Sequence, residues 1–156
     1  MRFVTVLCLL LSCFSSGPPP SPHPGGVAPP ISSTQLGGSA FKLSEHRGVP
    51  VALVFWASWC GPCRQEVPHL TELVKQYEGR VRFFSVNAGE TAPVAVRAAA
   101  SWGITWPVVF DLDARIQADY AVEAIPLLVI VDGEGVVRSR GLGLPPDITQ
   151  VLDGLL

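Results

Sequence analysis

The chain has 156 residues, of which 48% are hydrophobic and 15% are charged, and its formal net charge at pH 7 is −2. This length suits one domain with a buried core, and the apolar content excludes a disordered chain. The nearly balanced charge is not that of a protein that binds nucleic acid or anionic lipid through a basic surface, so we expect neither ligand.

Residues 1–16, MRFVTVLCLLLSCFSS, place Arg2 before a compact apolar run that ends in small residues. This order is typical of a secretory signal peptide, and the run is shorter than the roughly 20 apolar residues of a membrane-spanning helix. Leu10–Cys13 resembles a bacterial lipobox, in which the cysteine is lipidated, whereas ordinary cleavage after Ser15 is the alternative. We therefore predict export, with Cys13 as the lipidation site.

The next segment, residues 17–30, reads GPPPSPHPGGVAPP. Proline favours extended backbone and glycine keeps such a segment flexible, so this composition predicts a linker. From residue 31 to residue 156 the pattern is that of a globular domain.

Within this domain, short β-branched and aromatic runs alternate with helical periodicity. Strands are expected at residues 51–56, 81–86, 107–111, 127–131 and 136–139. Helices are expected at residues 62–79, 93–102, 115–120 and 146–156. This alternation, closed by a hairpin, predicts an α/β fold with a mixed central sheet that carries helices on both faces.

The first predicted helix begins with two cysteines, Cys60 and Cys63, directly after a buried strand. A thiolate is the reactive form of cysteine, and the free N–H groups of a helix N-terminus lower the pKa of a thiol below its ordinary value of about 8.5. We expect Cys60, at the edge of the helix, to be the exposed attacking sulfur. Cys63, one turn later, would then resolve the mixed disulfide.

Two other interpretations of the cysteine pair stay open, a metal site and a purely structural bridge. A tetrahedral zinc site needs four ligands, and the chain has no second C-x-x-C pair. His69 would face another side of the helix than Cys63, which leaves His46 as the remaining histidine of the domain.

The stretch FWASWCGPC, Phe55–Cys63, resembles the active-site segment of the thioredoxin superfamily, in particular its secreted TlpA/ResA-like branch. Pro68 matches a helix-kinking proline of the family, and Ala124–Pro126 matches the segment that holds its cis-proline. The residues between these two landmarks exceed those of a minimal thioredoxin by one helix–strand unit, here roughly Thr91–Asp111. The resemblance extends from about Gln35 to the C-terminus.

This resemblance implies a thioredoxin fold with that inserted helix–strand unit, and it implies a cis Pro126 packed against the dithiol. The backbone of Ile125 would pair with a substrate peptide, although a strand-starting proline without a functional role is the alternative for Pro126. Trp59, Gly61 and Pro62 would form the rim on which the substrate docks, and packing in the core is the alternative for Trp59.

Glu66 follows Cys63 by three residues, so it shares the helix face that carries Cys63 toward the interior. A carboxyl group there can exchange a proton with the Cys63 thiol, and a glutamate at this spacing is implicated in ResA-like proteins. An exposed glutamate favoured by the helix dipole is the alternative. Thioredoxins carry a buried aspartate six residues before the first cysteine, where this chain has Val54, so Glu66 or a bound water is left for proton transfer.

The Gly61–Pro62 dipeptide is the same as in reducing thioredoxins, which implies an extracytoplasmic enzyme that reduces protein disulfides. Such an enzyme needs no cofactor beyond the Cys60–Cys63 disulfide. The resemblance implies a membrane electron donor of the DsbD/CcdA kind and apocytochrome c as a client. We expect a monomer, periplasmic or anchored as a lipoprotein. The alternatives are a disulfide oxidase or isomerase and a non-catalytic peptide-binding module.

Overall fold

The computed structural model describes residues 19–156, so the predicted signal peptide and Cys13 lie outside the described residues. Its centre is a five-stranded sheet with the order β5-β4-β3-β6-β7. The strands are β3 (Val51–Trp56), β4 (Arg82–Ala88), β5 (Val108–Asp111), β6 (Leu127–Val131) and β7 (Val137–Leu142). β3, β4 and β5 run parallel, whereas β6 is antiparallel to both β3 and β7.

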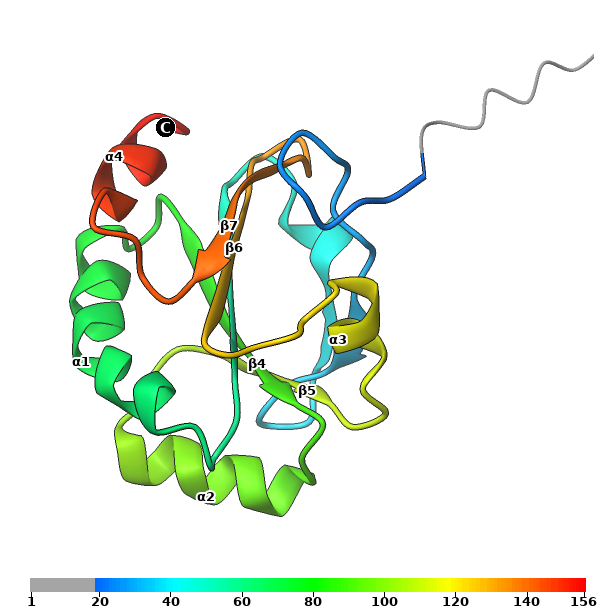
Figure 1. Ribbon diagram of the computed structural model, residues 1–156, viewed down its shortest axis with the longest axis vertical. Helices are drawn as coiled ribbons and strands as arrows, with labels where there is room; N and C mark the ends of the chain where they lie inside the picture. The colour runs from blue at the N-terminus through cyan, green and yellow to red at the C-terminus, as the bar shows by residue number, and fades with distance from the viewer. Residues whose placement is uncertain (1–18) are drawn as a thin grey trace, which may run out of the picture.

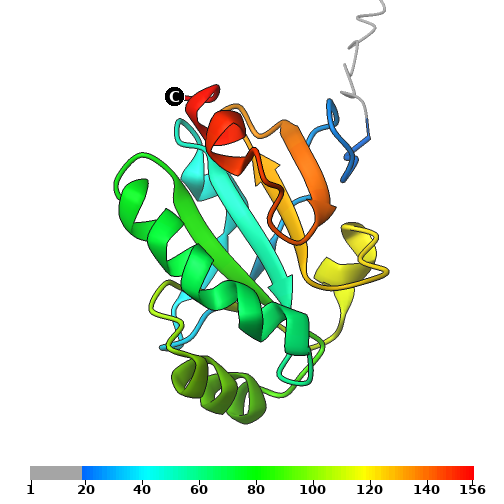
Figure 2. The same cartoon turned by 60° about the vertical axis from the view of Figure 1, so that its left-hand side comes forward.

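Helices cover both faces of this sheet, as the sequence predicts (Figure 1). The helices are α1 (Gly61–Gln76), α2 (Ala92–Trp102), α3 (Arg115–Asp119), α4 (Ile148–Asp153) and the 3-10 turn η1 (Leu43–His46). α1 and α4 lie on one face and α3 on the other, while α2 lies beyond the end of the sheet near the start of α1 (Figures 1 and 2). The inserted unit expected between the cysteines and Pro126 is α2 with β5. Within residues 19–156, no helix combines the length and apolar character needed to cross a membrane.

The central strand β3 divides the core into two layers. All six of its residues are buried, and alternate side chains of a strand point to opposite faces of the sheet. Leu53 and Phe55 pack in the layer that contains α3, whereas Ala52 and Val54 pack in the layer under α1. The strand therefore positions the segment that follows it, which carries the cysteines, between two packed layers.

Helix α1 is set by local signals at both ends. Cys60 is its N-cap residue, and Pro62 occupies the first turn, where a missing N–H costs no hydrogen bond. Gly79, just beyond the helix, has a φ of 75°, a backbone conformation that glycine adopts without steric cost. Val67, Leu70 and Leu73 form the buried face.

The proline- and glycine-rich segment differs from its prediction. The backbone N–H of Gly25 donates to the carbonyl of Val137 at 2.8 Å, and Ala28 donates to Gly135 at 2.9 Å. The hydroxyl of Tyr120 donates to the carbonyl of Pro29. The predicted linker is therefore wrong for residues 21–30, because backbone groups, which composition does not reveal, attach this segment to the edge of the sheet.

A second, small sheet consists of β1 (Ser32–Thr34) and β2 (Ala40–Lys42), which pair antiparallel. Its Phe41 is 2% exposed and joins the core layer that contains α3. Neither strand was expected from the sequence, since each has only three residues and shows little apolar periodicity.

Candidate active site

Cys60 and Cys63 form a disulfide at the point where β3 ends and α1 begins. The Sγ atom of Cys60 accepts a hydrogen bond from the backbone N–H of Cys63 at 3.1 Å. Cys60 thus caps the helix with its sulfur, and the free N–H groups and dipole of this terminus favour negative charge there.

The two cysteines do not differ in exposure, contrary to the expectation of an exposed Cys60. Each is 4% exposed, and both belong to one apolar cluster with Trp56 and with alanines of α2 such as Ala95. The inserted helix α2 therefore supplies much of the apolar surface against which the disulfide packs. The neighbouring Trp59 is 74% exposed, which excludes core packing for that side chain.

The Ile125–Pro126 peptide bond is cis, which confirms the expectation drawn from the family resemblance. Pro126 and Cys63 line one small cavity, and the carbonyl of Pro126 accepts a hydrogen bond from the N–H of Gly143 at 2.9 Å. Ile125 packs against the cluster that holds the disulfide. Residues more than 60 positions apart in the chain thus meet at the redox site.

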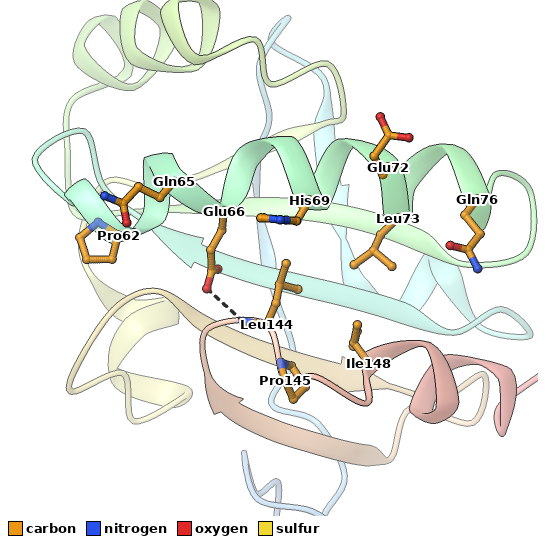
Figure 3. A pocket seen from close by; sticks show the side chains of 10 residues that line it. All are labelled: Pro62, Gln65, Glu66, His69, Glu72, Leu73, Gln76, Leu144, Pro145 and Ile148. Atoms are coloured by element: carbon orange, nitrogen blue, oxygen red, sulfur yellow. Dashed lines mark hydrogen bonds between the residues drawn. The ribbon is translucent and has the colours of Figure 1, made fainter.

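Glu66 points from helix α1 toward the loop that follows β7 (Figure 3). Its Oε1 accepts a hydrogen bond from the N–H of Leu144 at 3.0 Å. The approach is close at Gly143, where a Cβ atom would lie 2.6 Å from Oε1. Glu66 is half-buried and lines the same cavity as Cys63, so the two side chains are brought together.

The cavity beside Cys63 has a volume of about 10 Å³. Val54 lines it, so an apolar side chain stands where thioredoxins carry a buried aspartate. The other lining residues are Trp56, Cys63, Glu66, Val67, Leu70, Ser85, Trp102, Ile104, Trp106 and Pro126. Glu66 is thus the one carboxylate among the residues that surround this space.

A larger groove of about 580 Å³ runs along α1 away from the disulfide (Figure 3). It begins at Pro62 and Glu66, and its apolar floor comes from Leu73 and from residues after β7. The lining residues are Pro62, Gln65, Glu66, His69, Glu72, Leu73, Gln76, Leu144, Pro145 and Ile148. The groove is therefore an open surface that adjoins the redox site.

A second carboxylate, Glu90, was not identified from the sequence. It accepts hydrogen bonds from the backbone N–H of Ser58 at 2.7 Å, from the hydroxyl of Ser58 at 2.5 Å and from the amide of Asn87 at 2.8 Å. Burial disfavours its charge, but these hydrogen bonds outweigh burial and hold the pKa of Glu90 below its usual value. Glu90 thereby fixes the turn that precedes Cys60.

No three His, Cys, Asp or Glu side chains within residues 19–156 come close enough together to hold a metal ion. His46 stacks on Phe41, with ring centroids 5.3 Å apart, and also contacts Phe84. The histidine that the sequence left open as a metal ligand is thus part of an aromatic cluster.

Among known protein families, residues 23–155 match the redoxin family. The chain is 35% identical to the thiol-disulfide oxidoreductase ResA of Geobacillus kaustophilus over 134 residues, which cover 84% of this chain and 77% of that relative. It is 37% identical to the thioredoxin-like protein YneN of Bacillus subtilis over 122 residues, covering 76% and 71% of the two chains.

Among solved structures, a putative thiol:disulfide interchange protein DsbE from Chlorobium tepidum superposes with a TM-score of 0.76 at 29% identity. The match covers 85% of this chain and 94% of that protein. The thioredoxin domain of a Bacteroides vulgatus thiol-disulfide oxidoreductase, at 22% identity, shares the fold with a TM-score of 0.78 over 86% and 99% of the two chains.

Proposed function

Because this chain belongs to the redoxin family and is a thiol–disulfide oxidoreductase of the ResA-like type, we propose that it reduces disulfide bonds of client proteins outside the cytoplasm. The observation that carries this proposal is the Cys60–Cys63 disulfide, whose first sulfur caps helix α1 beside the cis Pro126. A dithiol in this position has the two properties that exchange requires, a stabilised thiolate and a second sulfur within bonding distance.

The reaction begins with the reduced enzyme. The Cys60 thiolate attacks one sulfur of a client disulfide, and the other client sulfur leaves with the electron pair and takes up a proton. The Cys63 thiol then loses its proton and attacks Cys60, which re-forms the Cys60–Cys63 bond found in this structure. The client leaves as a dithiol, and the two electrons have passed from the enzyme to the client.

In this proposed reaction, Glu66 is the group that takes up the proton of Cys63. Its side chain shares a cavity with Cys63, and one of its oxygens is held by the N–H of Leu144. A carboxylate so placed can accept the proton that Cys63 must lose before it attacks. Val54 leaves no aspartate in the cavity wall to compete for this step.

Client binding is assigned to the surfaces around the disulfide. Trp59 offers an exposed aromatic ring, and Gly61 and Pro62 are exposed on the first turn of α1. Ile125 precedes the cis-proline, where its backbone would pair with an extended client segment. The groove along α1 begins at Pro62 and gives such a segment an apolar surface on which to continue.

The direction of electron flow and the partners rest on the sequence. The Gly61–Pro62 dipeptide is that of reducing thioredoxins, and the N-terminal pattern predicts export with a lipid tether at Cys13. An enzyme that reduces clients there needs electrons from the membrane, which a thiol transporter of the DsbD/CcdA kind would supply. Apocytochrome c, whose cysteines must be reduced before haem attachment, is the proposed client.

The test is a trap for clients with Cys63→Ser, which leaves Cys60 to form a mixed disulfide that cannot be resolved. We expect covalent adducts on Cys60, identified by mass spectrometry, and none with the matched Cys60→Ser variant. Adducts on neither variant would contradict the assignment of Cys60 as the attacking sulfur.

A measurement of the Cys60–Cys63 reduction potential tests the direction. We expect a value near that of thioredoxin, about −270 mV, whereas a value near that of DsbA, about −120 mV, would favour the oxidase alternative.

A further inference from the structure

Ser85 is a buried hydroxyl in the middle of strand β4. It is 1% exposed, and its register neighbour on β3 is Val54. Placing a hydroxyl in an apolar layer costs about 1–3 kcal/mol unless it is hydrogen-bonded. Its oxygen accepts a hydrogen bond from the indole N–H of Trp106 at 2.8 Å. A serine that accepts one bond still carries its own proton, so Ser85 remains a donor.

Trp56, at the end of β3, is the second polar group of interest. Its side chain lines the cavity beside Cys63, and its Nε1 atom is buried without a hydrogen-bond partner among the residues that the structure describes. An indole nitrogen can only donate, and a buried donor without a partner is rare in folded proteins. The indole N–H of Trp56 therefore needs a hydrogen-bond acceptor.

The walls of the cavity are chemically complementary. The sheet side contributes two donors, the hydroxyl of Ser85 and the indole of Trp56, and helix α1 contributes the sulfur of Cys63 and the carboxylate of Glu66. One oxygen of Glu66 is engaged by Leu144, which leaves the other as an acceptor. The volume of about 10 Å³ is at the lower limit for one water molecule, which needs two to four polar partners.

From this arrangement we infer that the cavity is a binding site for a single water molecule, oriented by Ser85 and Trp56, that passes the proton from Cys63 to Glu66. The inference rests on the proposed function and deepens it. Ser85 is a positioning residue here, because it acts on the proton transfer through the water. Trp106 in turn fixes the oxygen of Ser85, so that its proton is directed away from the indole.

The proton moves from Cys63 to Glu66 during the resolving step. The water gives a proton to the Glu66 carboxylate, and the lone pair that this frees on its oxygen accepts the proton of Cys63 as the S–H bond breaks. The Cys63 thiolate then attacks Cys60, and the client sulfur leaves with the electron pair. Among the residues that line the cavity from α1, β3, β4 and the segments around Trp102, Trp106 and Pro126, only Cys63 and Glu66 carry an acidic side chain.

The experiment compares Ser85→Thr with Ser85→Val, which have nearly the same shape and differ in the hydroxyl. Both have one heavy atom more than serine and the same branched shape, so any packing strain is shared and cancels in the comparison. The pH dependence of the resolving step is measured by stopped flow, with each variant, and the wild type as reference, mixed with a small aromatic disulfide. We expect Ser85→Val to raise the apparent pKa of this step by about one unit relative to Ser85→Thr, a tenfold change in the reactive fraction at low pH.

Equal pH profiles for the two variants would overturn the inference, even if both unfold more easily than the wild type. A failure of the wild type itself to exchange disulfides would instead contradict the proposed function, so the two failures are distinguishable. A direct readout uses nuclear magnetic resonance of the reduced protein. We expect a cross-peak between the Trp56 indole proton and a long-lived water, and its absence would also overturn the inference.

Discussion

Two glutamates hold the redox motif from opposite sides, Glu90 before the cysteines and Glu66 after them. Glu90 accepts three hydrogen bonds, two from Ser58 and one from Asn87, so both of its oxygens are occupied. Glu66 accepts one, from Leu144, and lines the cavity next to Cys63. Both oxygens of Glu90 are thus engaged in hydrogen bonds, whereas Glu66 can accept further hydrogen bonds.

This difference suggests different roles for the two carboxylates, a structural one for Glu90 and the proposed proton transfer for Glu66. A carboxylate engaged by three donors is stabilised in its charged form and is a poor proton acceptor at neutral pH. A carboxylate with one donor and a neighbouring thiol can change its protonation state during the reaction. We therefore expect changes at Glu90 to appear in stability and changes at Glu66 to appear in rate.

The largest expected effect is on the rate with Glu66→Gln. The amide oxygen can still accept from Leu144, so the free energy of unfolding should change by less than about 0.5 kcal/mol. The amide cannot accept the Cys63 proton, so the resolving step should slow about 100-fold at pH 7, measured in single turnover. Glu72→Gln, which removes the same charge from the same groove, is the control, and an equal loss there would assign the effect to charge alone.

The next effect is on stability with Glu90→Ala. The variant leaves the N–H of Ser58 and the amide of Asn87 without their acceptor, and we expect the free energy of unfolding to fall by about 2 kcal/mol. Urea denaturation of the oxidised protein measures this loss. Glu123→Ala removes an exposed carboxylate, and equal losses for the two variants would show that the hydrogen bonds of Glu90 contribute nothing specific.

A smaller effect is expected when Glu66 is displaced without being mutated. A Cβ atom at Gly143 would lie 2.6 Å from Glu66 Oε1, and the φ of 68° at this position disfavours any side chain, by about 1–2 kcal/mol. Gly143→Ala should therefore slow the resolving step, though less than Glu66→Gln does. The control is Gly141→Ala, where a Cβ atom meets nothing within 4 Å. An unchanged rate in Gly143→Ala would mean that the position of Glu66 matters little.

The smallest expected effect is on the pH dependence of the free energy of unfolding. The pKa of Glu90 is lowered in the folded protein from its usual value of 4.5, so its charge contributes stability that is fully present above pH 4.5. This contribution is lost as the pH falls through the folded value, because the unfolded chain then binds the proton more readily. The difference in unfolding free energy between wild type and Glu90→Gln should thus be constant near neutral pH and shrink below about pH 4.5. A difference that persists unchanged at pH 3 would contradict the assigned charge state.

Much of the fold was predictable because its strands are apolar runs and its longer helices show helical periodicity. β3 and β6 lie at the predicted residues, 51–56 and 127–131, and α4, predicted over residues 146–156, occupies only Ile148–Asp153. β1 and β2 escaped prediction because two three-residue strands with mostly exposed side chains leave no periodic signal. The packed segment over residues 21–30 escaped because its contacts use backbone groups.

The residues of the site were also only partly predictable from the sequence. Cys60, Cys63 and Pro126 follow from local motifs, and the fold brings them together. Glu90 and Ser85 were not identified because their partners, Ser58 and Trp106, are brought to them by the order of the strands and not by any spacing along the chain. The prediction of an exposed Cys60 was wrong for a similar reason. Helix α2, which packs against Cys60, belongs to the inserted unit and lies far from Cys60 in the sequence.

Under the proposed lipid anchor at Cys13, the attachment of the N-terminal segment to the domain would set the reach of the enzyme from the membrane. The chain is bonded to the domain from Ser21 onward, through Val27 and Gly25. With an anchor at Cys13, the backbone between anchor and domain could extend at most roughly 29 Å, and not the roughly 60 Å that a linker up to Pro30 would allow. A tether of this length would keep the domain close to the membrane, so the clients that it serves would be those near the membrane surface.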